Sequence, residues 1–329
     1  MTESKLIDKY SRNLNYLRVS LTDRCNLRCI YCVPREDIPR LRHNEILRYE
    51  EILRIVHVGV GLGISKIRIT GGEPLVRQGV CDFLEQLGRI EGLADISLTT
   101  NGVLLQDHII RIRAAGIKRM NISLDTLKRK RFQQISGIDA FDKVWAGIRL
   151  AREAGFNPIK INVVALRGIN DDELIDFARL SLTHPFHIRF IEQMPFESGK
   201  KNHLPLLTPE IKSAVEGLGE LETVGKEIND GPAERFRFKG ARGEIGFIRP
   251  ISRHFCRSCN RLRLTADGHL RSCLLSDRQE DMKRPLRSGC SDGDLENIFF
   301  EAVKHKPSEH HLNDRPSEAL NGRMFAIGG

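Results

Sequence analysis

Residues 16–32, YLRVSLTDRCNLRCIYC, join a short strand-like run to a loop that carries three cysteines. The run at residues 16–20 has the aromatic and β-branched residues typical of a strand, and Cys25, Cys29 and Cys32 follow it with the spacing C-x3-C-x2-C. Three thiolates on one short loop can hold three irons of a 4Fe–4S cube and leave the fourth iron open. The segment therefore predicts a metal-binding loop at the end of a strand. A zinc site with a distant fourth ligand is the alternative.

Similar short runs recur along the first two thirds of the chain. We expect further strands at residues 66–70, 95–99, 119–124, 159–164 and 187–191. Between them lie stretches with apolar residues at helical spacing, such as Ile52, Leu53 and Val56. Strands that alternate with helices favour parallel strands joined by right-handed crossovers. Because a closed barrel of this type needs eight units, six units predict an α/β fold with an incomplete, open (β/α)6 TIM-like barrel.

The pattern changes near residue 200. A helix is expected from Thr208-Pro209, because proline is favoured in the first helical turn. Residues 234–240, 243–250 and 260–275 then alternate apolar and polar residues as antiparallel hairpins do, with a turn at residues 266–269. We therefore predict two domains: the barrel over residues 1–200, and a smaller, mainly antiparallel β domain over residues 201–329.

The cysteine positions indicate the compartment. Six of the eight cysteines form two groups near opposite ends of a 329-residue chain, whereas disulfide frameworks are typical of short secreted chains. Stretches without Asp, Glu, Lys or Arg, such as residues 55–65, are too short to span a bilayer. The first ten residues, MTESKLIDKY, lack the apolar core of a signal peptide. We expect a cytoplasmic protein with no membrane segment.

The net charge of +9 suits a polyanionic partner, either a nucleic acid or a phosphorylated small molecule. A merely basic surface would give the same value. Aromatic residues make up only 6% of the chain, which offers few stacking platforms for single-stranded nucleic acid.

The second cysteine group consists of Cys256, Cys259 and Cys273, with the spacing C-x2-C-x13-C in the predicted β domain. Read alone, this spacing resembles a zinc ribbon with Cys290 or His254 as the fourth ligand. An auxiliary iron–sulfur cluster is the other interpretation.

Arginines at alternate positions follow the second group. Arg261 and Arg263 are two residues apart on a predicted strand, so both side chains lie on one face. Arginine suits bidentate contacts with phosphate, and a solvated hairpin edge is the plainer interpretation.

Two motifs together resemble the radical S-adenosylmethionine (SAM) superfamily. One is the first cysteine loop with Tyr31 before its last cysteine, and the other is TGGEP at residues 70–74, after the second predicted strand. The resemblance implies that SAM chelates the open iron, and that Gly71, Gly72 and Glu73 receive its methionyl amino group. Glycines let the backbone approach a ligand closely, and Glu73 supplies a negative charge.

The second cysteine group, together with Asn260-Arg261-Leu262-Arg263, resembles one family within that superfamily, the GTP 3′,8-cyclases of molybdenum cofactor biosynthesis. The likeness runs from residues 17–24 through to Gly328-Gly329. It implies two 4Fe–4S clusters and SAM as cofactors. The open iron of the second cluster would contact the guanine of GTP. The implied reaction yields (8S)-3′,8-cyclo-7,8-dihydroguanosine 5′-triphosphate, through abstraction of the ribose 3′ hydrogen by a 5′-deoxyadenosyl radical and attack on guanine C8.

The resemblance also assigns residues and partners. The implied SAM contacts are Tyr31, Gly72, Glu73, Ser123 and Met194. The implied GTP contacts are Arg18, Arg68, Thr99, Lys160, Arg261, Leu262 and Arg263. The implied catalytic residues are Arg18, Arg261, Arg263, Gly328 and Gly329. A homodimer, a reductant such as flavodoxin and a downstream cyclic pyranopterin monophosphate synthase are implied as partners, with no nucleic acid and no membrane.

Two alternatives stay open. Another two-cluster radical SAM enzyme, for example a peptide-maturing one, would share the barrel and first loop, but its auxiliary site would usually hold more cysteines and lack the R-x-R. A zinc-containing nucleic-acid-binding protein would explain the charge and the C-x2-C spacing, but not Gly71-Gly72-Glu73 after a strand. Cys81 and Cys290 receive no role.

Overall fold

The computed structural model of the 329-residue chain describes residues 5–32, 40–194, 204–225, 231–253, 255–310 and 327. Six parallel strands follow one another in the first part of the chain, and each pairs with the next. They are β1 (Tyr16–Ser20), β2 (Lys66–Thr70), β3 (Asp95–Thr100), β4 (Arg119–Ser123), β5 (Ile159–Ala165) and β6 (Phe186–Glu192). All six predicted strands are confirmed, and no end differs by more than one residue.

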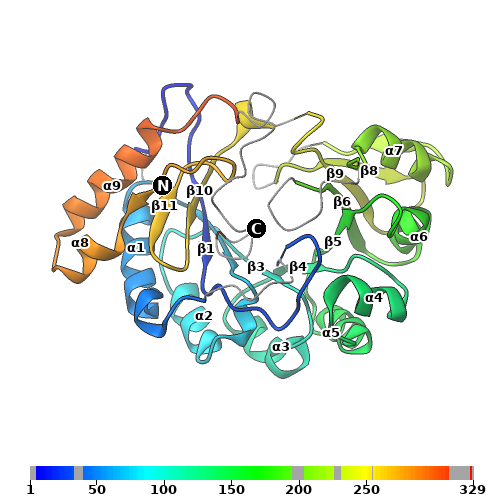
Figure 1. Ribbon diagram of the computed structural model, residues 1–329, viewed down its shortest axis with the longest axis horizontal. Coiled ribbons are helices and arrows are strands. Elements are labelled where there is room, and N and C mark those ends of the chain that lie inside the picture. The colour runs from blue at the N-terminus through cyan, green and yellow to red at the C-terminus, as the bar shows by residue number, and fades with distance from the viewer. Residues whose placement is uncertain are drawn as a thin grey trace.

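Helices cover the outer face of these strands, in the open arc that Figure 1 shows. They are α1 (Tyr49–Gly61), α2 (Val80–Gly88), α3 (Leu105–Ala114), α4 (Arg129–Ser136), α5 (Phe141–Glu153) and α6 (Leu174–Thr183). Strand residues that point outward, such as Leu17, Val19 and Ile67, are fully buried in the same core as helix residues such as Ile52 and Ile55. Burial of this apolar surface holds the helices on the sheet.

The inner face of the same strands is polar. On β1, Leu17 and Val19 belong to the core, whereas Tyr16 and Arg18 line an internal cavity. On β2, Arg68 also lines that cavity. Parallel strands that are covered on both faces are usually apolar on both. The inner face is therefore built to contact something other than apolar side chains.

The C-terminal strands extend this sheet at both ends. β9 (Glu244–Ile248) lies parallel to β6, and β10 (Arg261–Leu264) lies parallel to β1, with Arg263 opposite Arg18 in the register. Their antiparallel partners are β7 (Leu221–Thr223), β8 (Glu234–Phe238), β11 (His269–Arg271) and β12 (Glu280–Asp281). The order across the sheet is β12-β11-β10-β1-β2-β3-β4-β5-β6-β9-β8-β7.

The predicted hairpins are confirmed, but their place in the sheet was not foreseen. Local alternation predicts the antiparallel pairs β8–β9 and β10–β11, yet β9 and β10 also pair in parallel with distant barrel strands. The residue pattern of a single strand does not show which strand, remote in sequence, will pair with it in parallel. The proposed division at residue 200 stays a prediction, and the strands on both sides of it share one sheet.

The remaining helices lie at the two ends of the sheet. α7 (Thr208–Glu216), which begins at the predicted residue, packs beside α6. α8 (Lys283–Arg287) and α9 (Asp292–Lys304) lie at the other end, where α9 contacts α1, as Figure 1 shows. Within the described ranges, no helix is both long and apolar enough to cross a membrane.

Candidate active site

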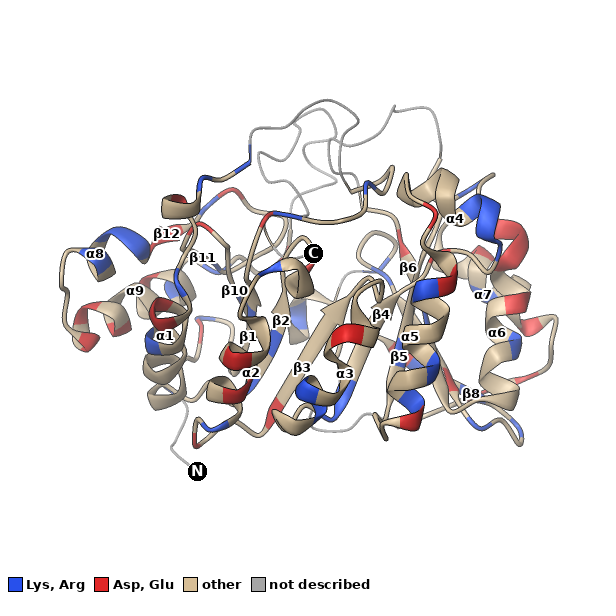
Figure 2. Ribbon diagram, turned by 90° about the horizontal axis from the view of Figure 1, so that it is seen from below, with Lys and Arg blue, Asp and Glu red and all other residues tan. Residues whose placement is uncertain are grey.

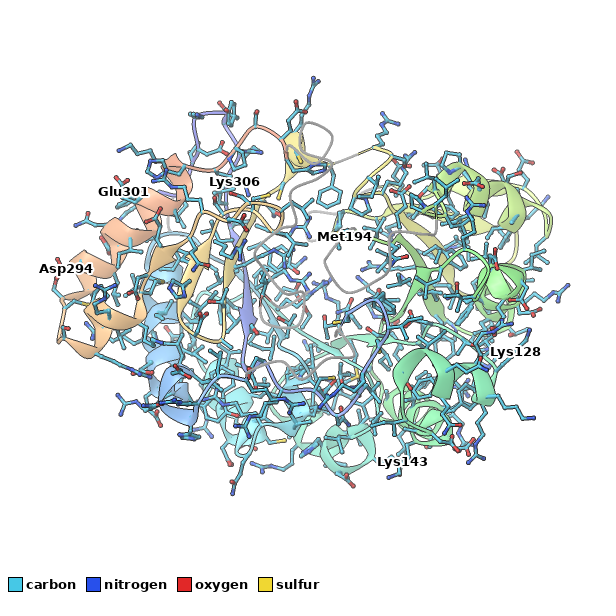
Figure 3. All side chains as sticks on the ribbon, in the orientation of Figure 1. Lys128, Lys143, Met194, Asp294, Glu301 and Lys306 are labelled. Carbon is cyan, nitrogen blue, oxygen red and sulfur yellow. The ribbon has the colours of Figure 1, made fainter. Side chains whose placement is uncertain are left out.

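A cavity of about 310 Å³ lies on the inner face of the sheet, bounded by β1–β6, β9, β10 and the loops that follow them. It brings together most of the predicted site residues from both halves of the chain. Those that line it are Arg18, Cys25, Cys29, Tyr31, Cys32, Arg68, Gly72, Thr99, Ser123, Met194, Cys256, Cys259, Arg261, Arg263 and Cys273. In Figure 3, Met194 lies near the middle of the molecule, inside the arc of helices.

Other predicted site residues do not line the cavity. Lys160 is buried on β5, two residues before Asn162, which does line it, so Lys160 lies on the same face nearer the start of the strand. Leu262 is fully buried in the core on the outer face, so only its backbone can face a ligand. Gly328 and Gly329 lie outside the described residues.

The glycine motif is packed against the first cysteine loop. The amide of Gly72 donates to the Thr22 carbonyl at 2.6 Å, and the amide of Glu73 donates to the Arg24 carbonyl at 2.8 Å. A Cβ built on Gly72 would overlap the Arg24 carbonyl oxygen. Only glycine therefore lets the two loops lie this close, and their backbones form one wall of the cavity.

Glu73, for which the resemblance implies a SAM contact, is buried behind the glycine loop, and that contact stays a prediction. Its side chain, 1% exposed, does not line the cavity and accepts hydrogen bonds from the Leu75 amide (3.0 Å), the Thr100 hydroxyl (2.8 Å) and the Asn101 amide (2.7 Å). Burial raises the pKa of Glu73 to about 7, although these three hydrogen bonds oppose the shift. Its carboxylate ties the glycine loop to the end of β3, and the backbone of Gly72 is left to meet a ligand.

Asn101, which the sequence analysis missed, links this network to the first cysteine trio. Its side-chain amide lies 3.6 Å from Cys25 Sγ and donates to Asn26 Oδ1 at 2.7 Å. The Leu27 amide also donates to Cys25 Sγ, at 3.4 Å. Asn101 directly follows β3, and this position at the carboxyl end of a parallel strand could have identified it as a candidate site residue.

Tyr31 is held by Asp125, another residue that the sequence analysis missed. The Tyr31 hydroxyl donates to Asp125 Oδ2 at 2.6 Å, and the Val164 amide donates to Asp125 Oδ1 at 2.9 Å. Burial raises the pKa of Asp125 to about 6, against the effect of both hydrogen bonds. The contact fixes the last turn of the cysteine loop against the ends of β4 and β5.

The first three thiols are suited to a cluster. Burial raises the pKa of Cys32 to about 12 and the pKa of Cys29 well above its usual value, and repulsion from Asp125 and from neighbouring thiols adds to both shifts. The sulfurs therefore lie near enough to interact, and iron would take the place of their protons. In the described ranges, no three His, Cys, Asp or Glu side chains converge on a single metal ion. Each thiolate of a cubane binds a different iron, so a cubane does not require that convergence.

The opposite wall of the cavity is cationic. Arg18 and Arg263 stand side by side on β1 and β10, with Tyr16 opposite Arg261 one step below. Burial lowers the pKa of Arg263 to about 10, with Arg261 adding to the shift. Figure 2 shows both signs of charge interspersed over the outer helices α2, α3, α5 and α6, whereas these arginines are gathered inside. Like charges held this close in a buried site favour a polyanionic ligand.

Two buried polar atoms belong to residues of β3 and β5 that line the cavity. Within the described part of the chain, Thr99 Oγ1 and Asn162 Oδ1 have no hydrogen-bond partner, and both residues line the cavity. Buried polar atoms are nearly always paired, so these two fit a polar ligand. Thr99 was predicted from the family resemblance. Asn162 and Arg189, which also lines the cavity, were not predicted.

The second cysteine trio lies among cations. Cys256 is the first residue of the short helix η4 (Cys256–Ser258), Cys259 directly follows that helix, and Cys273 lies two residues after β11. Burial would raise the pKa of Cys259, but Arg261 and Lys306 hold it at about 6.

Of the two candidates for a zinc ligand beside this trio, the structure describes only Cys290. Cys290 does not line the cavity, and its carbonyl accepts a hydrogen bond from Arg54 at 2.7 Å on the outer side of the fold. His254 lies outside the described residues.

Two protein families match this chain, one in each part of it. Radical SAM superfamily matches residues 19–181, and Molybdenum Cofactor Synthesis C matches residues 186–312. The GTP 3′,8-cyclase of Moorella thermoacetica is 49% identical over 308 residues, which cover 93% of this chain and 95% of the relative. That of Thermodesulfovibrio yellowstonii is 49% identical over 321 residues, covering 96% and 99%.

Among solved structures, Streptococcus suis SuiB bound to S-adenosylmethionine matches with a TM-score of 0.63 at 15% identity, covering 97% of this chain and 71% of that chain. This likeness confirms the predicted α/β fold and nothing more. The identity and coverage of the curated relatives are far higher. The chain belongs to the family of GTP 3′,8-cyclases.

Proposed function

We propose that this chain converts GTP to (8S)-3′,8-cyclo-7,8-dihydroguanosine 5′-triphosphate, the first step of molybdenum cofactor biosynthesis, as a radical SAM lyase. The observation that carries the proposal is that both cysteine trios and the buried arginines line one cavity. The match to relatives named GTP 3′,8-cyclase supports it over nearly the whole chain. The cofactors are SAM and two 4Fe–4S clusters.

The first half of the cavity would hold SAM. Cys25, Cys29 and Cys32 would hold its cluster, and SAM bound there would supply, with one electron from the reductant, the 5′-deoxyadenosyl radical that the removal of the ribose 3′ hydrogen requires. Gly72 offers its backbone to the ligand, while Ser123 and Met194 line the same space. Glu73, Asn101 and Asp125 position these groups and need not touch SAM.

The second half would hold GTP. Cys256, Cys259 and Cys273 would hold the second cluster near the guanine. The residues proposed for GTP are Arg18, Arg68, Thr99, Lys160, Arg261, Leu262, Arg263 and, beyond the first prediction, Asn162 and Arg189. Buried guanidinium groups bind phosphate oxygens with paired hydrogen bonds and exclude water from the reacting atoms.

The finer assignments are proposals from the family resemblance. We propose that Gly328 and Gly329 serve the reaction, that flavodoxin or a similar protein supplies electrons, and that the enzyme is a homodimer. We also propose that a cyclic pyranopterin monophosphate synthase receives the product. Exposed iron and reduced thiols favour a reducing compartment, so cytoplasm is the proposed location.

The experiment uses GTP deuterated at the ribose 3′ position. Protein reconstituted without oxygen is incubated with SAM, a strong reductant and this GTP. We expect deuterium in 5′-deoxyadenosine and an equal amount of cyclised nucleotide, because the same radical removes the 3′ atom. Cleavage of SAM without deuterium transfer would contradict the proposal and favour another substrate, such as the peptide of a peptide-maturing enzyme. A colourless, zinc-containing preparation would favour a nucleic-acid-binding protein.

A further inference from the structure

Lys306 lies just after the end of α9, buried beside the second cysteine trio. The residue is 2% exposed, and Figure 3 labels it near that end of the helix. Its ammonium donates to Cys259 Sγ at 3.6 Å, to the Arg261 carbonyl at 2.9 Å and to the Ser272 carbonyl at 2.5 Å. An ammonium has three N–H donors, so these contacts use all of them.

The charge of Lys306 requires a negative partner that carboxylates do not supply. Carbonyl oxygens satisfy hydrogen bonds but carry no net charge, and a buried ammonium without a counter-charge is strongly unfavourable. In the described part of the chain, no Asp or Glu forms an ion pair with Lys306, and the negative group in contact with it is the sulfur of Cys259. The position is therefore built for a charged sulfur ligand.

The backbone around Lys306 is fixed by a second buried cation. Arg12 donates to the carbonyls of Pro307 (2.6 Å) and Ser308 (3.2 Å), and also to the carbonyl of Cys256 at 2.7 Å. Its own charge is balanced by Asp8 at 2.6 Å. Arg12 thus joins the segment that carries Lys306 to the loop that carries the cysteines.

Among the residues that the structure describes, no lysine or arginine donates a hydrogen bond to a sulfur of the first cysteine trio. Within the described ranges, its side-chain nitrogen donor is the neutral amide of Asn101, at 3.6 Å from Cys25 Sγ. Arg28 lies close by but donates to the Cys25 carbonyl instead of its sulfur. The contact between an ammonium and a cysteine sulfur is therefore particular to the second trio.

We propose that Lys306 is a positioning residue whose ammonium offsets the negative charge of the second 4Fe–4S cluster and makes that cluster easier to reduce. The proposal rests on the ligands proposed above, Cys256, Cys259 and Cys273. Uptake of one electron adds one negative charge to the cluster, so a fixed positive charge and a hydrogen bond at a ligand sulfur favour the reduced state. Lys306 would thereby set the potential at the site where GTP is held.

The test is a reductive titration of the second cluster alone. In a full-length background with Cys25, Cys29 and Cys32 changed to Ser, only the second cluster remains to be observed. Lys306→Met and Lys306→Gln remove the charge, Lys306→Arg keeps it, and Lys304→Met removes an exposed lysine of α9 as the matched control. Each protein is titrated electrochemically without oxygen and followed by visible absorbance and electron paramagnetic resonance.

At a fixed applied potential, we expect both neutral variants to lower the ratio of reduced to oxidised cluster at least about tenfold, a shift of about 59 mV for one electron. Lys306→Arg and Lys304→Met should match the background protein. Neutral variants that hold about four irons per chain and keep the original potential would overturn the proposal. Loss of iron from Lys306→Met and Lys306→Gln, but not from Lys306→Arg, would support the proposal, because only the charge separates these variants. Loss of iron from all three would overturn it and show that the packing of the lysine side chain is what matters.

Metal-free samples separate this role from a structural one. Lys306→Met leaves the buried carbonyls of Arg261 and Ser272 without this donor and should melt earlier than its background, whereas Lys306→Gln can still donate to them and should melt close to it. Earlier melting together with an unchanged potential in Lys306→Gln would assign Lys306 to the fold and overturn the proposal. A background protein that binds no iron with Lys306 intact would instead refute the proposed cluster ligands.

Discussion

The two cysteine trios carry the same ligands in different surroundings, although burial raises the pKa of Cys256 in the second trio as it does those of the first three thiols. Around the first trio stand the carboxyl groups of Glu73 and Asp125, and burial raises the pKa values of the thiols. Around the second stand Arg261 and Lys306, which hold the pKa of Cys259 at about 6 although burial would raise it. Both trios line one cavity.

The contrast supports the proposal that the surroundings, and not the cysteines, would select a different ligand for each trio. SAM carries a positive sulfonium and an amino group, so it would suit a half of the cavity whose lining includes the Asp125 carboxyl group and neutral donors, with Glu73 buried behind that lining. GTP is a polyanion, so it is suited to a wall of buried guanidinium groups. One cavity with two charged halves can therefore hold both molecules in a single orientation.

The largest expected effect comes from removing one thiol of each trio. Cys29→Ser should abolish both 5′-deoxyadenosine and cyclised nucleotide. Cys256→Ser should still cleave SAM, but product should fall by at least about a hundredfold, because misplacement by about 1 Å costs that much. The two products are quantified side by side, with Cys290→Ser as a control outside the cavity. If Cys256→Ser shows the normal ratio of cyclised nucleotide to 5′-deoxyadenosine, the second trio does not position the substrate.

The carboxyl groups of the first half should appear in the pH dependence of stability. Because burial raises the pKa of Asp125 to about 6, the folded chain binds more protons than the unfolded chain below that pH. The contribution of Asp125 to the free energy of unfolding should therefore fall by about 3 kcal/mol as pH rises from about 4 to 6 and change no further above that pH. Glu73 extends the decline toward pH 7, because burial raises its pKa to about 7.

Asp125→Asn is the matched variant, because its amide can still donate to the Tyr31 hydroxyl and its oxygen can still accept from Val164. The metal-free proteins are unfolded with denaturant at several pH values. We expect the free energy of unfolding of Asp125→Asn to lack the decrease between about pH 4 and 6 that Asp125 causes in the unaltered protein. The same pH dependence in both proteins would mean that Asp125 titrates normally.

The smallest expected effect concerns the cationic half. Arg263→Ala and Arg261→Ala should each weaken GTP binding by about 1.5–3 kcal/mol, as expected for a charge-assisted hydrogen bond, with little loss of melting temperature. Arg257→Ala, an exposed arginine between the cysteines of the same loop, is the control. Binding by equilibrium dialysis and melting are measured together. A collapse in melting temperature with GTP affinity retained would assign the arginines to the fold.

Local patterns in the sequence were enough to predict the strands and the cysteine loops. The barrel strands alternate with helices, and each cysteine trio has a spacing that can be read within a single segment. The parallel pairing of β9 and β10 with the barrel edges could not be predicted, because the register joins residues such as Arg18 and Arg263 across most of the chain.

The residues that position the site were missed for the same reason. Tyr31 and Asp125 are 94 residues apart, and Lys306 lies 47 residues from Cys259. Neither Asp125 nor Lys306 stands in a motif, and each receives its role from a contact that only folding creates. Glu73 stands in a motif, but its three hydrogen bonds showed that it acts on the loops instead of lining the cavity.

Crossed binding measurements test the central claim most directly. Two full-length variants are needed, one with Cys25, Cys29 and Cys32 changed to Ser and one with Cys256, Cys259 and Cys273 changed to Ser. Dissociation constants for SAM and GTP are measured for both without oxygen. We expect the first variant to lose at least about tenfold in SAM affinity and to keep its GTP affinity, and the second to show the reverse. Equal weakening of both ligands in either variant would contradict a cavity with two separately charged halves.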